Sequence, residues 1–580
     1  MLTLAESVVP ALTKPKEPQQ PVDLLWGVKI PMRDGVKLDA TVYKPRDQKD
    51  PLPVIFTLTP YVSDSYLDRA LYFAKNGYIF ALVDVRGRGN SEGGFEPLAN
   101  EGNDGHDVVE WLAIQPWCNG DVTMWGGSYA GYDQWATAKN FPPHLKTIVP
   151  VASCYPGIDF PFAHNILYQY QIQWLTFTSG VTPNHRLFEN AEFWISKFSE
   201  HFMKHLPFKE LDSLTGNLTS YFQKITSHST PDDYWNAMCP TTEDFGRIDM
   251  PILTITGHYD GDQIGALTYY RRHMEYGSTR AKERHFLIIG PWDHPGTRTP
   301  KKEVGGLTFG DTSVLDLNLL HKQWYDWTLK GGPKPEFLRK RVAYYLAGAE
   351  EWKYADDLKS ISTETRRLYL SSHDGQANDV FRSGRLTTLE PENEAPDTYI
   401  YDPLDTRSAE LYQKEIKNFI TDQTGALNLF GNGVVYHSDP FEADTEVTGQ
   451  VKFVVWAAID VPDTDFWVEL DEIKPDGTSI LLSFDNLRAR YRESLTEEKL
   501  VVPGEVNRYE FNGFYFFSRK VAKYSRLRLV LCCPNTIFVE KNYNSGMEVA
   551  KESGEDARTA HVTIYHDHER RSYLEIPIVR

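Results

Sequence analysis

The stretch Val122–Asp133, which reads VTMWGGSYAGYD, constrains the fold of this chain more than any other. An apolar run at residues 122–125 meets GGSYAG at residues 126–131, and a segment compatible with a helix follows. A serine at the apex of such a strand, turn and helix needs small neighbours, because the two backbones nearly touch there. The pattern therefore predicts either a nucleophile elbow, with Ser128 exposed over the end of a sheet, or an ordinary glycine-rich turn.

Short apolar runs alternate with helical periodicity around this stretch. Asp104–Gln115 has the spacing of a helix. Strand-like runs occur at Val54–Leu58, Tyr78–Val83, Ile148–Val151, Pro251–Thr256 and His285–Gly290. The alternation predicts a doubly wound α/β domain, which we assign to residues 25–155 and 246–340, after a flexible N-terminal tail at residues 1–24.

Two further regions have a different pattern. Residues 156–245 are rich in aromatic side chains and lack buried-strand runs, so we predict a helical cap inserted into the α/β domain. Residues 341–580 carry repeated short strands without helices between them, which predicts a C-terminal all-β sandwich of the jelly-roll type. The strands expected there are Arg341–Leu346, Glu446–Ile459, Phe466–Ile473, Leu481–Phe484, Asn507–Phe511, Arg526–Cys532 and His561–Tyr565.

Charge and cysteine content exclude several classes of function. The formal net charge of −19 argues against nucleic acid or an anionic membrane as a partner. The five cysteines have no C-x-x-C spacing and their number is odd, so neither a disulfide framework nor a metal site is expected. The histidines of residues 561–568 are interpreted as a solvated strand end. With a poor secretion signal and no apolar run near the roughly 20 residues that span a bilayer, we expect a cytoplasmic protein without a metal or other cofactor.

A serine nucleophile needs a general base and an acidic group that orients the base. In α/β-hydrolase order the acid and then the histidine follow the serine, each just after a strand of the sheet. The run Pro251–Thr256 leads into a loop with Asp260, and His285–Gly290 leads into a loop with His294. The competing candidates in the same two loops are His258, Asp262 and Asp293.

These motifs together resemble the serine hydrolases that include cocaine esterase, the α-amino acid ester hydrolases, the glutaryl acylases and the X-Pro dipeptidyl-peptidases. The resemblance runs in order from Val28 to the C-terminus. It rests on IPMRDGVKLDATVYKP, TPYV, DVRGRGNSEGGF, the block EGNDGHDVVEWLAIQPWCNGDVTMWGGSYAG, GHYDG, GPWDH, DTEVTGQV and DGTSILLSFDNLRARYRESL.

The resemblance implies that Ser128 is the nucleophile, His294 the general base and Asp260 the orienting acid. It also implies an oxyanion hole formed by the Tyr129 backbone N–H and the Tyr61 hydroxyl, two donors of the kind that acyl transfer requires. The loop at residues 86–93 is interpreted as structural, with Arg86 in a buried ion pair, because no G-K-[ST] follows it. Cap aromatics either fill the core or line the substrate pocket, and the candidates for the pocket are Tyr170, Trp174 and Phe177.

The expected function is hydrolysis of a carboxylic ester or amide through an acyl-enzyme. An ester is favoured because only about 25 residues precede the first strand, whereas X-Pro peptidases of the resembled family carry a substantial extra N-terminal domain. A dipeptidyl-peptidase, an amino acid ester hydrolase or acylase, and an acyltransferase acting on a natural product remain as alternatives. A ligand-binding protein with a vestigial hydrolase domain is the non-enzymatic alternative. The partner is a small-molecule ester or amide, and a homo-oligomer is compatible with the sequence.

Overall fold

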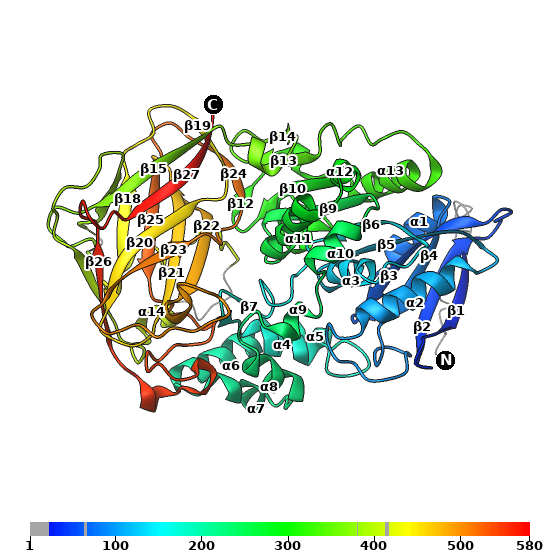
Figure 1. The fold of residues 1–580 in the computed structure, drawn as a ribbon, viewed down its shortest axis with the longest axis horizontal. Helices are drawn as coiled ribbons and strands as arrows, with labels where there is room; N and C mark the ends of the chain where they lie inside the picture. The colour runs from blue at the N-terminus through cyan, green and yellow to red at the C-terminus, as the bar shows by residue number, and fades with distance from the viewer. Residues whose placement is uncertain (1–21, 63–65, 380, 412–416) are drawn as a thin grey trace, which may run out of the picture.

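The computed structural model describes residues 22–62, 66–379, 381–411 and 417–580. The predicted tail therefore lies outside the described residues up to residue 21, and Val22 already begins the first strand. Figure 1 shows an α/β domain at one end of the molecule, a β sandwich at the other, and a group of helices along one side between them. No helix among the described residues is long and apolar enough to cross a membrane.

A ten-stranded sheet in the order β1-β2-β4-β3-β5-β6-β9-β10-β13-β14 forms the centre of the α/β domain. Its inner strands pair in parallel, as the fully buried runs of β3 and β4 indicate. The strands are β1 (Val22–Pro31), β2 (Lys37–Pro45), β3 (Leu52–Thr59), β4 (Ile79–Asp84), β5 (Cys118–Gly127), β6 (Leu145–Val151), β9 (Ile252–Tyr259), β10 (His285–Asp293), β13 (Val342–Leu346) and β14 (Glu351–Ala355).

Helices cover both faces of this sheet. Their apolar sides pack into two separate clusters, one with α2, α3 and α11 and one with α1 and α13. The helices are α1 (Leu67–Lys75), α2 (Glu101–Ala113), α3 (Tyr129–Ala138), α11 (Gln263–Tyr276), α12 (Thr279–Glu283) and α13 (Leu317–Lys330). Helix α13 ends at Gly331, which adopts a left-handed conformation with φ 67°.

The cap consists of a short hairpin and seven helices between β6 and β9. Its aromatic side chains, among them Trp194, Phe222 and Trp235, pack in one cluster with Tyr129 and Tyr132 of α3. The elements are β7 (Phe162–Ala163), β8 (Ile166–Leu167), α4 (Tyr170–Phe177), α5 (His185–Phe188), α6 (Ala191–Met203), α7 (Leu211–Thr215), α8 (Ser220–Ser227), α9 (Asp233–Asn236) and α10 (Thr242–Arg247). A second small hairpin, β11 (Glu303–Val304) and β12 (Leu307–Thr308), follows β10.

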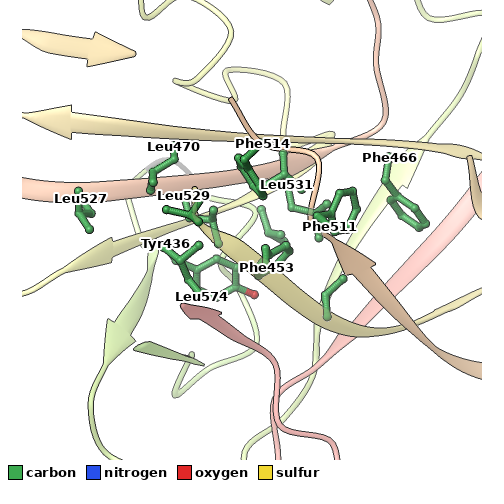
Figure 2. Packing of buried hydrophobic residues seen from close by; sticks show 14 of the residues in the cluster. Tyr436, Phe453, Phe466, Leu470, Phe511, Phe514, Leu527, Leu529, Leu531 and Leu574 are labelled. Atoms are coloured by element: carbon green, nitrogen blue, oxygen red, sulfur yellow. The ribbon is translucent and has the colours of Figure 1, made fainter. Parts of the chain in front are cut away.

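The C-terminal strands curl into the predicted jelly-roll sandwich around one apolar core. Figure 2 shows Leu470, Leu529 and Leu531 pointing into this core beside Tyr436 and Phe453. The elements are β15 (Glu364–Ser371), β16 (Gly384–Thr387), β17 (Asp397–Tyr401), α14 (Arg407–Glu410), β18 (Gly433–Ser438), β19 (Thr445–Gly449), β20 (Lys452–Ile459), β21 (Asp465–Ile473), β22 (Ser479–Arg488), β23 (Val506–Phe511), β24 (Phe517–Val521), β25 (Arg526–Cys532), β26 (Ala560–Tyr565) and β27 (Tyr573–Val579).

Two expectations about the C-terminal part need correction. The strand at Arg341–Leu346 was assigned to the sandwich, but β13 pairs in parallel with β10 and, with β14, extends the ten-stranded sheet. Residues 561–568 are not simply a solvated strand end, because the His566 ring is fully buried 2.9 Å from an Asp397 carboxylate oxygen.

A buried ion pair supports the loop at residues 86–93, as the sequence predicted. Arg86 lies 2.5 Å from Asp104 of α2 and 2.9 Å from Asp34. Asp104 is almost fully buried, so the pair fixes the strand end of β4 against the helix that leads into β5.

Buried polar contacts also join the cap to the sandwich. The Glu540 carboxylate accepts the backbone N–H of Leu167 at 3.0 Å and an Arg488 nitrogen at 2.7 Å. Both charged side chains are almost inaccessible to water. Removing either partner would leave a buried charge, so this contact holds the cap hairpin in a fixed position beside the sandwich.

Candidate active site

Ser128 lies at the apex of a strained turn between β5 and α3. Its backbone has φ 63° and ψ −124°, a conformation that a residue with a side chain rarely adopts. A Cβ on Gly126 would lie 2.6 Å from the Ala130 Cβ, and a Cβ on Gly131 would lie 2.5 Å from the Val151 carbonyl oxygen. The small residues are therefore required by the close approach of strand and helix, as expected of a nucleophile elbow.

Asp260 and His294 meet at the ends of the neighbouring strands β9 and β10. His294 Nδ1 lies 2.7 Å from Asp260 Oδ1. Asp260 is completely buried, and its carboxylate also accepts the Thr256 hydroxyl at 2.8 Å and the Asp262 backbone N–H at 3.1 Å. With Nδ1–H donated to the carboxylate, Nε2 is left as the proton acceptor that a general base needs.

The Ser128 hydroxyl contacts a different carboxylate from the one that holds the histidine. Its Oγ donates to Asp262 Oδ2 at 3.4 Å. This Asp262 oxygen lies 3.8 Å from His294 Nδ1. Among the described residues no hydrogen bond joins Ser128 Oγ to His294. The hydroxyl and the imidazole line the same cavity, and catalytic hydrogen bonds are commonly long or misaligned before substrate binds.

The charged and buried groups of the site shift the pKa values of His294 and Asp262. Burial lowers the pKa of His294, but the Asp262 carboxylate and the hydrogen bond to Asp260 raise it above its ordinary value of 6.5. Burial raises the pKa of Asp262 to about 6, against the opposing attraction of His294. The site thus contains a histidine whose pKa is raised, beside a second carboxyl group, that of Asp262, whose pKa is raised to about 6.

Tyr129 begins helix α3, so its backbone N–H is one of the donors that a helix leaves without an internal partner. The phenol donates to Glu101 Oε1 at 2.5 Å and accepts the Leu98 backbone N–H at 2.6 Å. The buried Glu101 side chain therefore anchors the Tyr129 side chain at the first turn of α3, and the Tyr129 backbone N–H lies at the elbow.

Tyr61 follows strand β3, and its ring lies edge-to-face with that of Tyr129, with centroids 6.4 Å apart. Its hydroxyl oxygen accepts the Trp174 indole N–H at 3.1 Å, and its ring stacks on Phe177 with centroids 5.5 Å apart. Burial raises the pKa of Tyr61 well above its ordinary value, so the phenol keeps its proton. Because the indole N–H can only donate, the Tyr61 hydroxyl does not donate its own proton to Trp174.

A cavity of about 680 Å³ joins these groups. Ser128, His294, Tyr61 and the predicted pocket residues Tyr170 and Trp174 line it. Phe177 packs behind Tyr61 and is not one of the lining residues. The cavity wall is completed by residues of the sandwich, among them Trp467, Glu469, Phe484, Tyr515, Val530 and Cys532.

Sequence reasoning missed Asp159 and the contribution of the sandwich. Asp159 lines the cavity from the start of the cap, and its carboxylate accepts the backbone N–H groups of Tyr155 at 2.7 Å and Gly265 at 2.5 Å. Burial and the nearby Asp262 raise its pKa well above the ordinary value. No motif surrounds Asp159, so no local signal distinguished it from a solvated loop aspartate.

Two competing candidates, His258 and Asp293, have structural roles. His258 is 3% exposed, its ring packs near Phe516, and burial lowers its pKa to about 3. Asp293 Oδ1 accepts the backbone N–H of Gly296 at 2.9 Å and so shapes the loop that carries His294. Neither side chain lines the cavity.

Two family models match most of the length of this chain. The model of the X-Pro dipeptidyl-peptidase (S15) family matches residues 34–296, and that of the X-Pro dipeptidyl-peptidase C-terminal non-catalytic domain matches residues 337–575. Cocaine esterase of Rhodococcus sp. (strain MB1 Bresler) is 27% identical over 593 residues, which cover 95% of this chain and 98% of the relative.

Two solved structures share the whole architecture. An aminopeptidase from the marine sediment archaeon Thaumarchaeota archaeon has a TM-score of 0.84 at 22% identity, covering 99% of both chains. An α-amino acid ester hydrolase has a TM-score of 0.83 at 19% identity, covering 99% of this chain and 100% of that chain. At these identities the structural similarities establish the fold alone.

Proposed function

The chain belongs to the serine hydrolase family of cocaine esterase and the X-Pro dipeptidyl-peptidases (S15, CocE/NonD), and from this premise we propose that it cleaves a carboxylic ester or amide through an acyl-enzyme. Ser128 is the proposed nucleophile, His294 the general base and Asp260 its orienting acid. Tyr61 and the Tyr129 N–H are the proposed oxyanion donors. The supporting observation is that the strained serine and the Asp260–His294 pair face one cavity.

In the proposed reaction the Ser128 hydroxyl turns from Asp262 toward His294 Nε2, a rotation about one single bond. Oγ then attacks the substrate carbonyl carbon while Nε2 takes its proton. The carbonyl oxygen becomes an oxyanion that accepts the Tyr61 O–H and the Tyr129 N–H. The bond to the leaving group breaks as His294 returns the proton to it, and water, activated by the same histidine, hydrolyses the acyl-enzyme.

Labelling of the serine tests the assignment directly. Wild-type protein is expected to react with a fluorophosphonate probe and to hydrolyse short-chain esters such as ethyl butyrate. Ser128→Ala should lose both properties while keeping the thermal unfolding profile of the wild type. Undiminished labelling of Ser128→Ala would overturn the nucleophile assignment.

A second candidate function is hydrolysis of substrates whose acyl group carries an α-ammonium. The observation that favours it is a pair of carboxyl groups, Asp262 and Asp159, that line the same cavity as the nucleophile. Burial raises the pKa of both groups, and the Asp262 charge raises that of Asp159 further. A substrate cation placed between them would relieve this repulsion and provide the positive charge that the pair lacks.

Matched esters separate the two candidates. Alanine ethyl ester and ethyl isobutyrate differ by an ammonium in place of a methyl group. Under the second candidate the protein prefers the alanine ester, and Asp262→Asn removes that preference. A protein that prefers isobutyrate, or an Asp262→Asn variant that keeps the alanine preference, would exclude the ammonium role.

A further inference from the structure

The sandwich presents an apolar outer face to the active-site cavity. In a β sandwich, residues that point away from the core are ordinarily polar. On β21, Phe466, Val468 and Leu470 are buried in the core, and Trp467 and Glu469 point to the opposite side. On β25, Leu529 and Leu531 point inward, as Figure 2 shows, so Val530 and Cys532 point outward.

The outward side chains are direct neighbours across three strands. Trp467 is paired in register with Cys532, and Glu469 is paired with Val530 on one side and Phe484 on the other. The Trp467 and Phe484 rings stack with centroids 4.7 Å apart and planes at 13°. We call these five residues the β-domain chamber, since all of them line the cavity.

Tyr515 connects the chamber to the catalytic loops. Its ring centroid lies 4.9 Å from that of Phe484, and its hydroxyl donates to the Gly261 carbonyl at 3.3 Å. Gly261 stands between Asp260 and Asp262. The chamber and the nucleophile therefore line one cavity, and a substrate attacked by Ser128 can extend into the chamber.

Glu469 gives the apolar chamber a single acidic group. Arg528, two residues before Val530 on β25, acts on Glu469 only through its charge, because its nitrogens donate to Asp471 at 3.1 Å, Ser479 at 2.9 Å and Gln423 at 3.3 Å. No ion pair within the described residues joins Glu469 to a basic side chain. Burial raises the pKa of Glu469 to about 8, and the neighbouring Asp471 adds to this effect. A carboxyl group in such surroundings gains most from a ligand that brings a positive charge.

The stacked rings favour the same kind of ligand. A protonated amine gains an electrostatic attraction over an aromatic face, and Trp467 provides the strongest such face. An aromatic ring of the ligand gains apolar burial against Phe484 and Val530. The chemistry of the chamber thus fits a ring-bearing group that carries a basic nitrogen.

The position of the chamber indicates which half of the substrate it holds. Gln263, which follows the loop of Asp260 and Asp262, exchanges two hydrogen bonds with Phe516, of 2.9 and 2.6 Å. The sandwich therefore contacts the element that follows the loop of Asp260 and Asp262, whereas the hydrogen bond from Trp174 places the Tyr61 hydroxyl beside the cap. The general base must pass its proton to the leaving atom, so the leaving group lies on its side.

We propose that the β-domain chamber is the subsite for the leaving group, and that it takes an alcohol or amine that bears an aromatic ring and a protonated amine, with Glu469 as the partner of the cation. This assignment rests on the proposed function, because it needs Ser128 to attack the substrate between the two halves.

Isosteric esters test the proposal. 4-(Dimethylaminomethyl)benzyl butyrate and 4-isobutylbenzyl butyrate differ in one atom, nitrogen for carbon, in the leaving group. The wild type is expected to show the higher kcat/KM for the amine, and Glu469→Gln to reduce the ratio of the two kcat/KM values about tenfold, as for a lost hydrogen bond to a charged group. The surface variant Glu283→Gln is the matched control and should keep the wild-type ratio.

A second pair of esters locates the effect. Ethyl 4-(dimethylaminomethyl)phenylacetate and ethyl 4-isobutylphenylacetate carry the same difference in the acyl group, and Glu469→Gln should leave their ratio unchanged. Cys532→Phe, which fills the chamber beside Trp467, should lower kcat/KM for both benzyl butyrates about tenfold relative to ethyl butyrate. A Glu469→Gln effect that follows the acyl pair, or no change of either ratio, would overturn the proposal while ethyl butyrate is still hydrolysed. If the wild type neither hydrolyses ethyl butyrate nor reacts with the fluorophosphonate probe, the proposed function itself has failed.

Discussion

Replacing Asp260 by Asn should cost far less activity than replacing it by Ala, because the hydrogen-bond partners of its carboxylate can also hold an amide. Oδ1 accepts two fixed donors, His294 Nδ1–H at 2.7 Å and the Asp262 N–H at 3.1 Å. Oδ2 accepts the Thr256 hydroxyl at 2.8 Å, a group that can also turn to accept. In Asp260→Asn the new side-chain amide is therefore expected to keep its oxygen toward His294 and to donate its NH₂ to Thr256.

This orientation preserves the histidine tautomer and removes only the negative charge. The loss of a charge from such a hydrogen bond is worth about 1.5–3 kcal/mol, or about 10- to 150-fold in kcat. Asp260→Ala loses the orienting acceptor as well, and the expected loss is about 10⁴-fold, the size found when a triad histidine is held in the wrong tautomer. Asp262→Asn is the matched control in the same loop, with an expected change below about tenfold on ethyl butyrate, because its Oδ2 lies 3.8 Å from Nδ1.

Steady-state kcat for ethyl butyrate, measured with each variant at saturating substrate, separates these expectations. Thermal unfolding shows whether each variant is folded. The reasoning is refuted if Asp260→Asn falls as far as Asp260→Ala. It is refuted equally if Asp262→Asn proves the most damaging of the three, which would make Asp262 the orienting acid.

Two further predictions concern the base and the oxyanion donors. A base must be neutral to accept a proton, so kcat/KM should fall as the pH drops through the pKa of His294, which its carboxylate neighbours raise above 6.5. Asp262→Asn removes one of those neighbours, so a pH–rate profile of this variant should have its acid limb at lower pH, and an unmoved limb would contradict the assignment. Tyr61→Phe should lower kcat for ethyl butyrate about 100- to 1,000-fold with little change in KM. Trp174→Phe, which keeps the phenol, should lose much less, and equal losses in the two variants would show that Tyr61 acts through packing.

The elements that follow simple periodicity were predictable from the sequence, and the partners chosen by loop conformation were not. Asp260 and His294 were found because each follows a buried strand of a parallel sheet, whose carboxyl ends meet at one edge. The second carboxylate was only a rival, because residues 260 and 262 share one loop and its conformation decides which of them faces the imidazole. Strand β13 was placed in the wrong sheet for a related reason, since an apolar strand has the same pattern in an α/β sheet as in a sandwich.

The cavity shows why substrate choice is harder to read from such a chain than its chemistry. The proposed nucleophile, base and oxyanion donors all belong to one domain, in which each functional group stands at a strand end. The walls come from three separate parts of the chain, represented by Tyr61, Trp174 and Trp467, and only the fold brings them together. One local signal was nevertheless present: β21 alternates a core face with an outward tryptophan, and large apolar side chains on the outer face of a sandwich require a cover. Here those outward side chains line the active-site cavity. Substitutions of the outward aromatic residues in the C-terminal strands should therefore change the preferred leaving group while the catalytic residues stay the same.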